Sequence, residues 1–324
     1  MISVVVPAWN AGEWLAEALE SLQAQGEAFG ECIVVDDGST DSTPEIARMF
    51  AARDSRFRLV SIPNSGPSVA RNVGLELVTG SWLAFMDADD VWLPGAFDRL
   101  LQGASEAGED CGIIEGNVVR WKSGVPLAGM MARADAAPGG LRMLSGRSAT
   151  LLSLYQTGVE ASLYAKLYRP PLWDGIRFPE GELYEDLSVF HRVAMRARVY
   201  ARLDSDVYAY RLRPESLIHA FNPRRLIVLG VTDRIRRRFA GDPELLRAAT
   251  DRRLAASFNM LGLMLANPSA ADPVNMADCR GFIRRHAAAS LRDSGARLKN
   301  RLGAMAALLL PRRLLDMMLR RVYR

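Results

Sequence analysis

The chain has 324 residues, of which 49% are hydrophobic and 24% charged, a composition that excludes intrinsically disordered and fibrous proteins. The length predicts two domains, although one large α/β domain stays open. The net charge is +4, but residues 284–324 hold eleven Lys or Arg against two acidic residues, so this tail carries +9 and the rest carries −5. That balance argues against a nucleic-acid partner and indicates one end that faces an anionic surface.

The three cysteines, Cys32, Cys111 and Cys279, are odd in number and widely spaced. This pattern argues against a disulfide framework and a cysteine-based zinc site, and it is typical of the cytoplasm. The first apolar run is too short for a signal peptide, and no apolar stretch reaches the roughly 18 residues of a membrane span. We therefore expect a cytoplasmic protein.

Short apolar strands alternate with helical periodicity through the first 90 residues. The strands are expected at residues 2–6, 33–35, 57–62 and 82–86, and the helices at 15–22, 46–50 and 69–77. Asn10 is expected to cap the first helix, and Ser42 with Glu45 to form a capping box for the second. This alternation predicts an α/β fold with a mostly parallel sheet covered by helices on both faces.

The second half is less regular. It predicts strands at residues 112–121 and 199–210, a helix at 187–194, and a long loop at 124–146 that is a candidate binding element. From residue 223 onward the pattern is helical, with breaks near Pro243, Pro268, Pro273 and Pro311. We expect a catalytic α/β domain over residues 1–220 and a helical region over 221–324.

Polar segments follow four of the predicted strands: residues 7–10, 36–41, 64–72 and 87–90. In a parallel sheet such positions share one edge, where ligands bind. Each has a simpler explanation, with Asn10 as a helix cap, Asp37 in a turn and Arg71 on a solvated helix face. Their occurrence at equivalent positions of one sheet nevertheless favours a binding site.

The segment Asp87-Ala88-Asp89 carries the most chemical information. Residues two apart in an extended segment point the same way, so the two carboxylates can converge on Mg²⁺ or Mn²⁺ and hold a substrate diphosphate. The chain has no G-x-G-x-x-G and no G-x-x-x-x-G-K-[ST]. Their absence argues against a dinucleotide dehydrogenase and a P-loop NTPase.

The runs VVVPAWN, VVDDGSTD, NSGPSVARNVG and MDADD together resemble the bacterial family 2 glycosyltransferases of the GT-A fold. The resemblance covers about the first hundred residues. It implies inverting transfer of a sugar from a nucleotide diphosphate donor, often UDP, to a saccharide or lipid-linked acceptor in cell-surface polysaccharide assembly. It also implies that Asp87 and Asp89 hold Mn²⁺ or Mg²⁺. The donor-binding residues that it implies are Pro7, Ala8, Trp9, Asn10, Asp36, Asp37, Ser65, Arg71, Asp87 and Ala88.

The same resemblance implies a catalytic base in a short acidic motif further along the chain. Here that motif is residues 182–186, in which Asp186 matches the base and Glu185 lies beside it. A base in this position would take the proton of the acceptor hydroxyl. The alternative is that Asp186 only caps the helix that follows.

Three further residues are weaker candidates. Lys166 is one of only three lysines and has either a specific or a surface role. Arg211 and His219 lie in a segment that resembles the family's closure of the donor site, where either side chain would contact the diphosphate.

Processive synthases of the family carry a Q-x-x-R-W motif, and Arg120-Trp121 looks like its end. The Gln is absent, and the pair precedes Asp186 instead of following it. We therefore expect a non-processive enzyme. Two alternatives stay open, a nucleotidyltransferase and a non-catalytic scaffold of the same fold.

The last residues form an amphipathic helix on a helical wheel. Leu and Met side chains occupy one side of residues 312–324 and Arg side chains the other. Such a helix can lie in a membrane interface, here on the inner face of the cytoplasmic membrane. The alternative is a helix that packs on the protein or on a second subunit of a homodimer.

Overall fold

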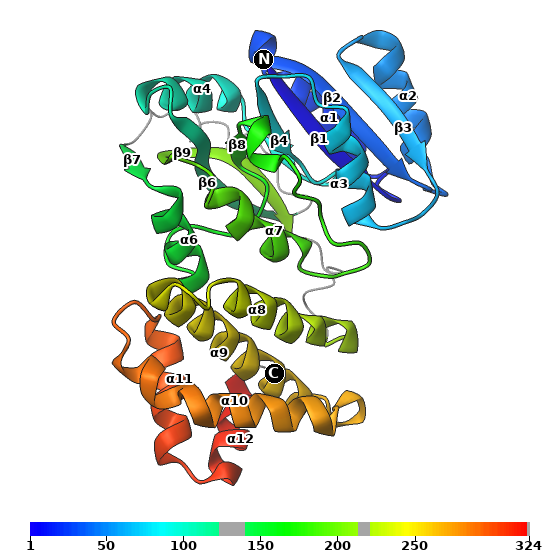
Figure 1. Cartoon of the computed structure of the whole chain (residues 1–324). Helices are drawn as coiled ribbons and strands as arrows, with labels where there is room; N and C mark the ends of the chain where they lie inside the picture. The colour runs from blue at the N-terminus through cyan, green and yellow to red at the C-terminus, as the bar shows by residue number, and fades with distance from the viewer. Residues whose placement is uncertain (123–139, 213–220, 323–324) are drawn as a thin grey trace. The chain divides into compact units, whose positions relative to one another are not determined.

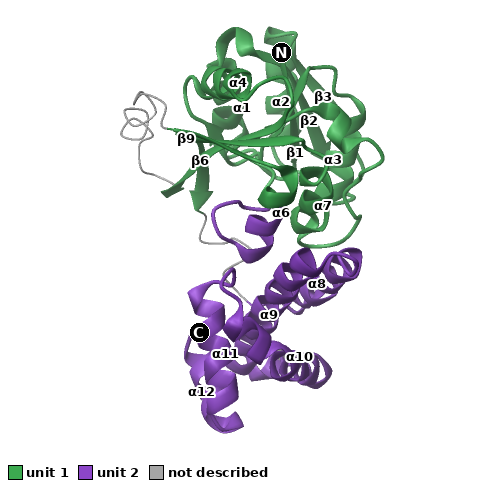
Figure 2. Cartoon of the chain, turned by 60° about the vertical axis from the view of Figure 1, so that its left-hand side comes forward, with its two compact units in different colours: residues 1–149, 162–214 green, residues 150–161, 215–324 purple. Residues whose placement is uncertain are grey.

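The computed structural model describes residues 1–122, 140–212 and 221–322. These form two compact units, one of residues 1–149 with 162–214 and one of residues 150–161 with 215–324 (Figure 2). The predicted domain boundary at residue 220 falls outside the described residues. Residues 150–161, which we expected in the catalytic domain, group with the helical unit.

One mixed sheet of nine described strands forms the centre of the first unit (Figure 1). Its order is β3-β2-β1-β4-β8-β6-β9-β5, with β7 paired to β9. The strands are β1 (Ile2–Ala8), β2 (Phe29–Asp37), β3 (Phe57–Ile62), β4 (Trp82–Phe85), β5 (Val91–Trp92), β6 (Cys111–Lys122), β7 (Leu141–Leu144), β8 (Lys166–Tyr168) and β9 (Val199–Leu212).

The predicted α/β class is confirmed, but the sheet is mixed instead of mostly parallel. The strands β1 to β4 are parallel, as are β6 and β9. In contrast, β8 is antiparallel to both of its neighbours, and β5 and β7 are antiparallel to β9. The expectation rested on strand–helix alternation, which ends where the first four strands end.

Strand β1 continues through Pro7, where the sequence suggested that it would end. Pro7 pairs in register with Val35 of β2, whereas the pairing of β1 with β4 stops at Val5. Because Pro7 has no N–H to donate, it fits where no further β4 residue needs one. Ala8, the last residue of β1, still pairs with Asp36 of β2, and the residues that follow it lie beyond the end of the strand.

Helices α1 to α4 of the first unit pack on the sheet (Figure 1). The helices are α1 (Leu15–Gln23), α2 (Thr43–Arg53), α3 (Pro67–Glu76), α4 (Ala96–Glu106), α6 (Gly146–Tyr155), of which residues 150–155 group with the second unit, and α7 (Glu185–Ala194). Short 3₁₀ turns lie at Gly26–Ala28 and Pro170–Trp173. Helix α4 was missed because its buried face includes Gly103 and Ala104, which add little hydrophobic signal. A Cβ atom on Gly103 would lie 2.8 Å from Ile114 Cδ1, so α4 packs closely against β6 at this glycine, and a larger residue would require the Ile114 side chain to shift.

Both predicted helix caps are wrong. Helix α1 begins at Leu15, and Asn10 lies before it in a left-handed conformation with φ of 47°. Ser42 precedes α2 but makes no side-chain capping bond. The backbone N–H of Thr43 instead donates to Asp41 at 3.0 Å.

The second unit is helical, as predicted. It contains the 3₁₀ turns Pro223–Leu226 and Pro268–Ala270 and the helices α8 (Ile227–Arg238), α9 (Pro243–Ala266), α10 (Pro273–Arg292), α11 (Leu298–Leu309) and α12 (Arg312–Val322). Asp242 and Asp272 cap α9 and α10, and proline opens both helices, a position that needs no N–H. Among the described helices, none combines the length and apolar character required to cross a bilayer.

A buried arginine ties three helices of this unit together. Arg253 of α9 forms ion pairs with Asp233 of α8, at 3.2 Å, and with Asp278 of α10. Its guanidinium also lies 4.6 Å from the ring centroid of Phe282. A charge this deeply buried needs such partners to offset its desolvation.

Candidate functional site

The ends of β1 and β2 are joined by hydrogen bonds between the two segments that follow them. The backbone N–H of Asn10 donates to Ser39 Oγ at 3.0 Å, and Asn10 Oδ1 accepts from the N–H of Thr40 at 2.9 Å. The side chain of Trp9 beside them is 57% exposed. The left-handed turn at Asn10 thus serves to join two loops, and it leaves an aromatic ring at the surface.

Asp36 and Asp37 at the end of β2 are both buried. The two carboxylate oxygens of Asp37 accept from the backbone N–H groups of Ser65, at 2.7 Å, and Gly66, at 2.8 Å, just before α3. Asp36 accepts from the N–H of Ser39 at 3.1 Å. Asp37 therefore fixes the loop that contains Ser65.

The turn after β4 carries Asp87, Ala88 and Asp89. The N–H of Asp90 donates to the carbonyl of Asp87 at 3.1 Å and closes this turn. The N–H of Asp87 donates to the hydroxyl of Tyr208 on β9 at 3.2 Å. Asp87 and Asp89 are both partly exposed, whereas Ala88 is buried.

Arg211 near the end of β9 holds the same turn. Its Nε donates to the carbonyl of Asp89 at 2.6 Å, and its Nη2 lies 2.5 Å from Glu17 of α1. Its guanidinium also lies 3.8 Å from the ring centroid of Trp121. With only 4% of its side chain exposed, Arg211 is placed to fix the backbone of the turn, whereas the sequence suggested a direct contact with a diphosphate.

Asp90 is a buried carboxyl that the sequence analysis did not select. Its Oδ1 accepts from the backbone N–H of Arg211 at 2.8 Å. Burial, with the nearby charges of Asp87 and Asp89, raises the pKa of Asp90 to about 9. Its place directly after the D-x-D segment is the one sequence signal that could have identified it.

Arg71 of α3 links the turn after β4 to the acidic motif before α7. Its Nη2 lies 2.9 Å from Asp87 Oδ1, and its Nη1 lies 2.7 Å from Glu185 Oε1. The arginine side chain is 10% exposed. Burial would lower the pKa of Arg71, but the charges of Asp87 and Glu185 outweigh it and the pKa is raised. The structure thus brings together three residues that were predicted separately.

The residue after Arg71 holds the chain that leads to the acidic motif. Asn72 Nδ2 donates to the carbonyl of Phe178 at 3.0 Å, and Asn72 Oδ1 accepts from the N–H of Phe178 at 2.8 Å. The guanidinium of Arg71 lies 5.8 Å from the Phe178 ring centroid. Asn72 follows Arg71 in the NSGPSVARNVG run, but its partner could not be predicted from that run.

The acidic motif ends in a strained residue. Tyr184 precedes α7 with φ of 64°, a conformation that bulky residues rarely adopt. Strain of this kind is often kept at functional sites. It sets the direction in which Glu185 and Asp186 enter the first turn of α7, where the helix dipole favours ionised carboxylates.

Glu185 and Asp186 have different surroundings. Glu185 forms the ion pair with Arg71, whereas Asp186 is partly exposed and accepts from the N–H of Leu187 at 2.6 Å. Burial and the charges of Glu115 and Asp186 raise the pKa of the Tyr168 hydroxyl on β8, so Asp186 lies near this strand. His219 lies outside the described residues.

Lys166 is not a surface residue. Its Nζ lies 2.9 Å from Glu115 Oε1, and both side chains are buried. The hydroxyl of Tyr200 donates to the other oxygen of Glu115 at 2.8 Å. This network joins β8, β6 and β9 within the sheet and supports a structural role for Lys166.

The chemistry of the Asp87 and Asp89 side chains fits a hard divalent cation, because both offer carboxylate oxygens from one turn. Within the described part of the chain, no cluster of three or more His, Cys, Asp or Glu residues that could hold a metal ion is found. Two carboxylates alone would not fill the coordination sphere of such a cation, which takes about six ligands. Arg71 occupies one oxygen of Asp87, which favours Asp89 as the more direct ligand.

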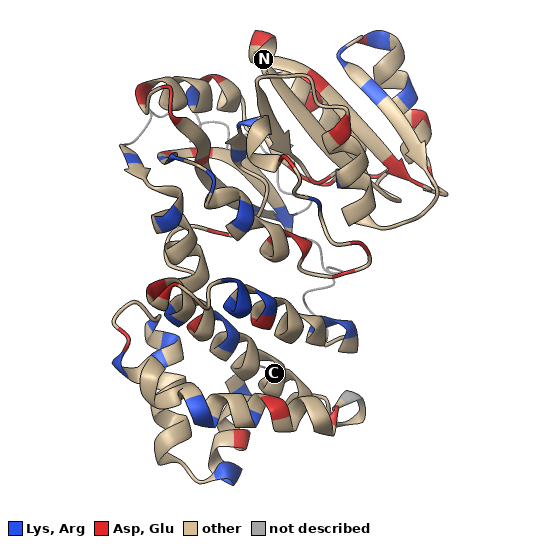
Figure 3. Ribbon diagram, viewed as in Figure 1, with Lys and Arg blue, Asp and Glu red and all other residues tan. Residues whose placement is uncertain are grey.

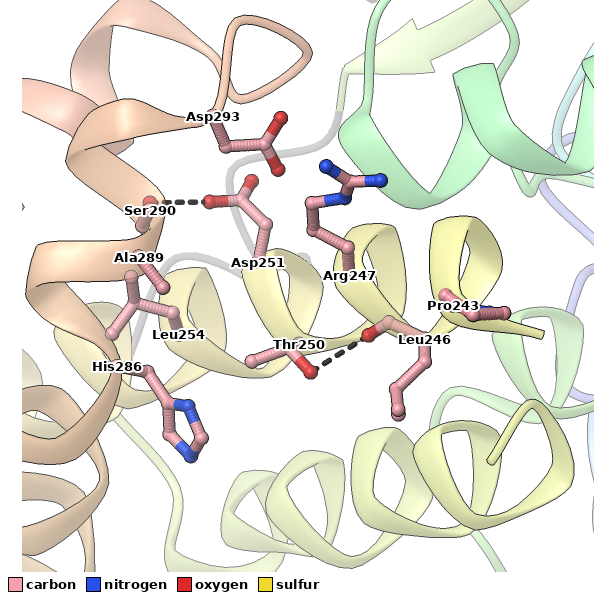
Figure 4. A pocket seen from close by; sticks show the side chains of 10 residues that line it. All are labelled: Pro243, Leu246, Arg247, Thr250, Asp251, Leu254, His286, Ala289, Ser290 and Asp293. Carbon is pink, nitrogen blue, oxygen red and sulfur yellow. Dashed lines mark hydrogen bonds between the residues drawn. The ribbon is translucent and has the colours of Figure 1, made fainter. Parts of the chain in front are cut away.

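The helical unit contains a separate pocket of about 320 Å³ between α9 and α10 (Figure 4). Asp251 on its wall accepts from Ser290 Oγ at 2.8 Å and from Asn300 Nδ2 at 2.7 Å. Burial raises the pKa of Asp251. Arg247 and His286 also line the pocket, which contains none of the site residues predicted from the sequence.

Comparison with known proteins bears on both halves of the chain. The model of the family described as Glycosyl transferase family 2 matches residues 3–128. The glycosyltransferase GlyA of Streptococcus pneumoniae is 29% identical over 222 residues, which are 67% of this chain but 31% of GlyA. The chain therefore spans about a third of that relative.

Two solved structures share the fold. One is S. aureus TarS 1–349 in complex with UDP-GlcNAc, at 21% identity with a TM-score of 0.68, covering 99% of this chain and 90% of the TarS 1–349 chain. The other is the mannosyltransferase PcManGT from Pyrobaculum calidifontis in complex with GDP-Man and Mn²⁺, at 19% identity with a TM-score of 0.53, covering 98% and 83%. These two likenesses show that this chain has the GT-A fold, and residues 3–128 match the model of the family 2 glycosyltransferases.

Proposed function

We propose that the protein is an inverting, non-processive glycosyltransferase that uses a nucleotide-diphosphate sugar, with UDP as the favoured nucleotide. The observation that carries this proposal is the position of Arg71 between Asp87, of the predicted metal site, and Glu185, beside the predicted base. A donor site and a base must lie close together for direct transfer. The TarS structure is a complex with UDP-GlcNAc and the PcManGT structure a complex with GDP-Man, and both support a nucleotide-sugar substrate.

The donor would bind across the ends of β1, β2 and β4. Pro7, Ala8, Trp9 and Asn10 would line the nucleotide pocket, with the exposed Trp9 ring available for stacking. Asp36 would contact the base or ribose, and Ser65 and Ala88 would lie beside the donor. Asp37 and Arg211 would act by fixing the loops that surround the donor, since their side chains already bind backbone groups.

Asp89, with Asp87, would hold Mn²⁺ or Mg²⁺ against the donor diphosphate. The ion would supply positive charge that stabilises the leaving diphosphate. PcManGT is a Mn²⁺ complex, which supports a divalent cation here. Arg71 would keep Asp87 in place and carry its own charge close to the site.

Asp186 would act as the general base. Its carboxylate would take the proton of the acceptor hydroxyl while the acceptor oxygen bonds to the anomeric carbon from the face opposite the diphosphate. The bond to the diphosphate oxygen breaks with its electron pair, so the configuration inverts. Glu185, paired with Arg71, would orient this region.

The proposed acceptor is a saccharide or lipid-linked saccharide in cell-surface polysaccharide assembly. The proposed location is cytoplasmic, at the inner face of the membrane. We also propose that residues 1–220 are the catalytic part and that residues 221–324 contribute to acceptor binding or to docking on the membrane. If the tail did not contact lipid, a homodimer would form through the helical part.

The test is Asp186→Asn, which keeps the size of the side chain but cannot take a proton. We expect transfer to fall by roughly 10²–10⁴ with unchanged UDP affinity. The matched control is Glu180→Gln in the exposed segment before the motif, which should transfer normally. Normal transfer by Asp186→Asn would contradict this assignment. Release of pyrophosphate by the wild type would indicate a nucleotidyltransferase, and no turnover with any nucleotide sugar would indicate a scaffold.

A further inference from the structure

Helix α11 has an exposed apolar stripe. Leu298, Leu302, Met305 and Leu309 are 68%, 51%, 40% and 73% exposed. Their spacing of three or four residues places them within about 60° of one another on the helix, at 100° per residue. The opposite face holds Asn300 and Ala304, which are buried. The stripe is therefore a continuous apolar surface that the described part of this unit does not cover.

Helix α12 packs in part on the rest of its unit, which is one of the two alternatives that its sequence left open. Leu319 is 3% exposed and faces the rest of the unit, and Asp316 accepts from Arg280 of α10 at 2.9 Å. Part of the apolar side predicted for the membrane is thus used in packing. Leu314 and Met317 remain exposed, at 45% and 61%.

The exposed side of α12 is basic as well as apolar. Arg313, Arg320 and Arg321 are exposed beside Leu314 and Met317. Across residues 297–322 seven Lys or Arg residues stand against Asp316 as the one acidic residue (Figure 3). On α11, Lys299 and Arg301 lie on the two sides of the apolar stripe, at about +100° and −60° from Leu298.

The combination of apolar and basic side chains on α11 and α12 indicates which kind of partner can cover this surface. A second copy of the chain would bring an equally basic border against this one, and like charges at an interface are unfavourable. An anionic lipid surface would accept the apolar side chains and attract the basic ones. Charge complementarity therefore favours lipid.

We propose that the exposed faces of α11 and α12 together form a docking surface for an anionic membrane, with the α11 stripe as its apolar part. The surface is defined by Leu298, Leu302, Met305 and Leu309 of α11 and by Leu314 and Met317 of α12. It differs from an amphipathic tail that acts alone, because four of its six exposed apolar residues lie on α11. It does not depend on the proposed transfer reaction.

The test is flotation of the full-length protein with vesicles. One set is phosphatidylcholine alone, and the other is an equal mixture of phosphatidylcholine and phosphatidylglycerol. We expect binding to the mixed vesicles only. Binding should weaken as salt rises from about 0.1 M to about 1 M, where the Debye length falls from about 10 Å to about 3 Å.

The variant Leu302→Glu/Leu309→Glu should reduce the bound fraction at least tenfold. The matched control, Met49→Glu/Val274→Glu, adds the same charge at apolar residues that are exposed elsewhere, 38% and 78%. It should float like the wild type. Circular dichroism of both variants shows whether each one is folded. Donor hydrolysis by both variants shows whether catalytic activity is independent of vesicle binding.

Two results would overturn the proposal. The first is failure of the wild type to bind mixed vesicles at low salt. The second is equal flotation of Leu302→Glu/Leu309→Glu and wild type. If that variant also had a lower mass by light scattering, the α11 stripe would be an interface between copies of the chain.

Discussion

The ion pairs of Arg71 lead to the most specific prediction about the site. Arg71→Met removes the charge but keeps an unbranched apolar side chain against Phe178. It leaves Asp87 and Glu185 without their shared cation. We expect a loss of both stability and transfer.

The size of the stability loss follows from burial. Removing one partner of a buried ion pair costs about 3–5 kcal/mol, whereas an exposed pair contributes about 0–1 kcal/mol. Glu185 is 17% exposed and would remain poorly solvated, but Asp87 is 35% exposed and can be hydrated. We therefore expect the free energy of unfolding to fall by about 2–3 kcal/mol.

The loss of transfer follows from the position of Asp87. A displacement of about 1 Å in a reacting group can reduce the rate about 10²-fold. We expect kcat/KM for the donor to fall by about that factor, which corresponds to about 2.7 kcal/mol. Initial rates at saturating acceptor, with urea unfolding of the same samples, would measure both effects.

The matched control is Arg56→Met. Arg56 also pairs with a carboxylate, that of Asp54 at 2.7 Å, and its guanidinium lies 4.8 Å from the ring centroid of Phe29. Neither Asp54 nor Phe29 is a predicted site residue, so the loss of the Arg56 guanidinium should lower the free energy of unfolding and leave transfer unchanged. A folded Arg71→Met protein with wild-type kcat/KM would refute the reasoning, as would an equal loss of transfer in Arg56→Met.

Three further predictions concern other parts of the chain. Gly38→Ala should lower the free energy of unfolding in urea by about 1–3 kcal/mol more than Gly26→Ala. Both glycines have positive φ, but only at position 38 would the new Cβ lie against a backbone nitrogen, at 2.8 Å, so equal losses of stability would contradict this prediction. Lys166→Met should lower the free energy of unfolding by about 3–5 kcal/mol, because it leaves the buried Glu115 without its cation. An unchanged melting temperature would show that the ion pair contributes little to stability. Burial raises the pKa of Asp251, so the folded state keeps this proton to higher pH than the unfolded state does. The contribution of Asp251 to the stability of the wild type should therefore fall as the pH rises above about 3.9, and Asp251→Asn should lose that pH dependence. Parallel curves of urea midpoint against pH for the two proteins would contradict the prediction.

Much of the fold was predictable from local pattern. The strand Phe57–Ile62 has the predicted bounds, and α9 and α10 begin at the predicted prolines. These features depend on residues close in sequence, such as a β-branched run or an aspartate followed by proline. The errors arose where tertiary contacts decide, as at Asn10, whose left-handed turn is held by hydrogen bonds to residues about thirty positions away.

The candidate site shows the same division. The resemblance identified Arg71, Asp87, Glu185 and Asp186, but it did not indicate that the arginine pairs with two of these carboxylates. That pairing depends on how α3, β4 and α7 meet, which no short-range pattern specifies. Arg211 was selected for a diphosphate contact, whereas its side chain holds the backbone carbonyl of Asp89.

The ion pair between Arg211 and Glu17 joins residues 194 positions apart. At a synthesis rate of about 5–20 residues per second, Arg211 leaves the ribosome's active site about 10–40 s after Glu17 does. The turn at Asp89 would lack the guanidinium that holds its backbone throughout that interval. Nascent chains halted before residue 211 should therefore contain the parallel strands β1 to β4 but lack a fixed D-x-D turn, so assembly of the site would be among the last steps in the biogenesis of the first unit.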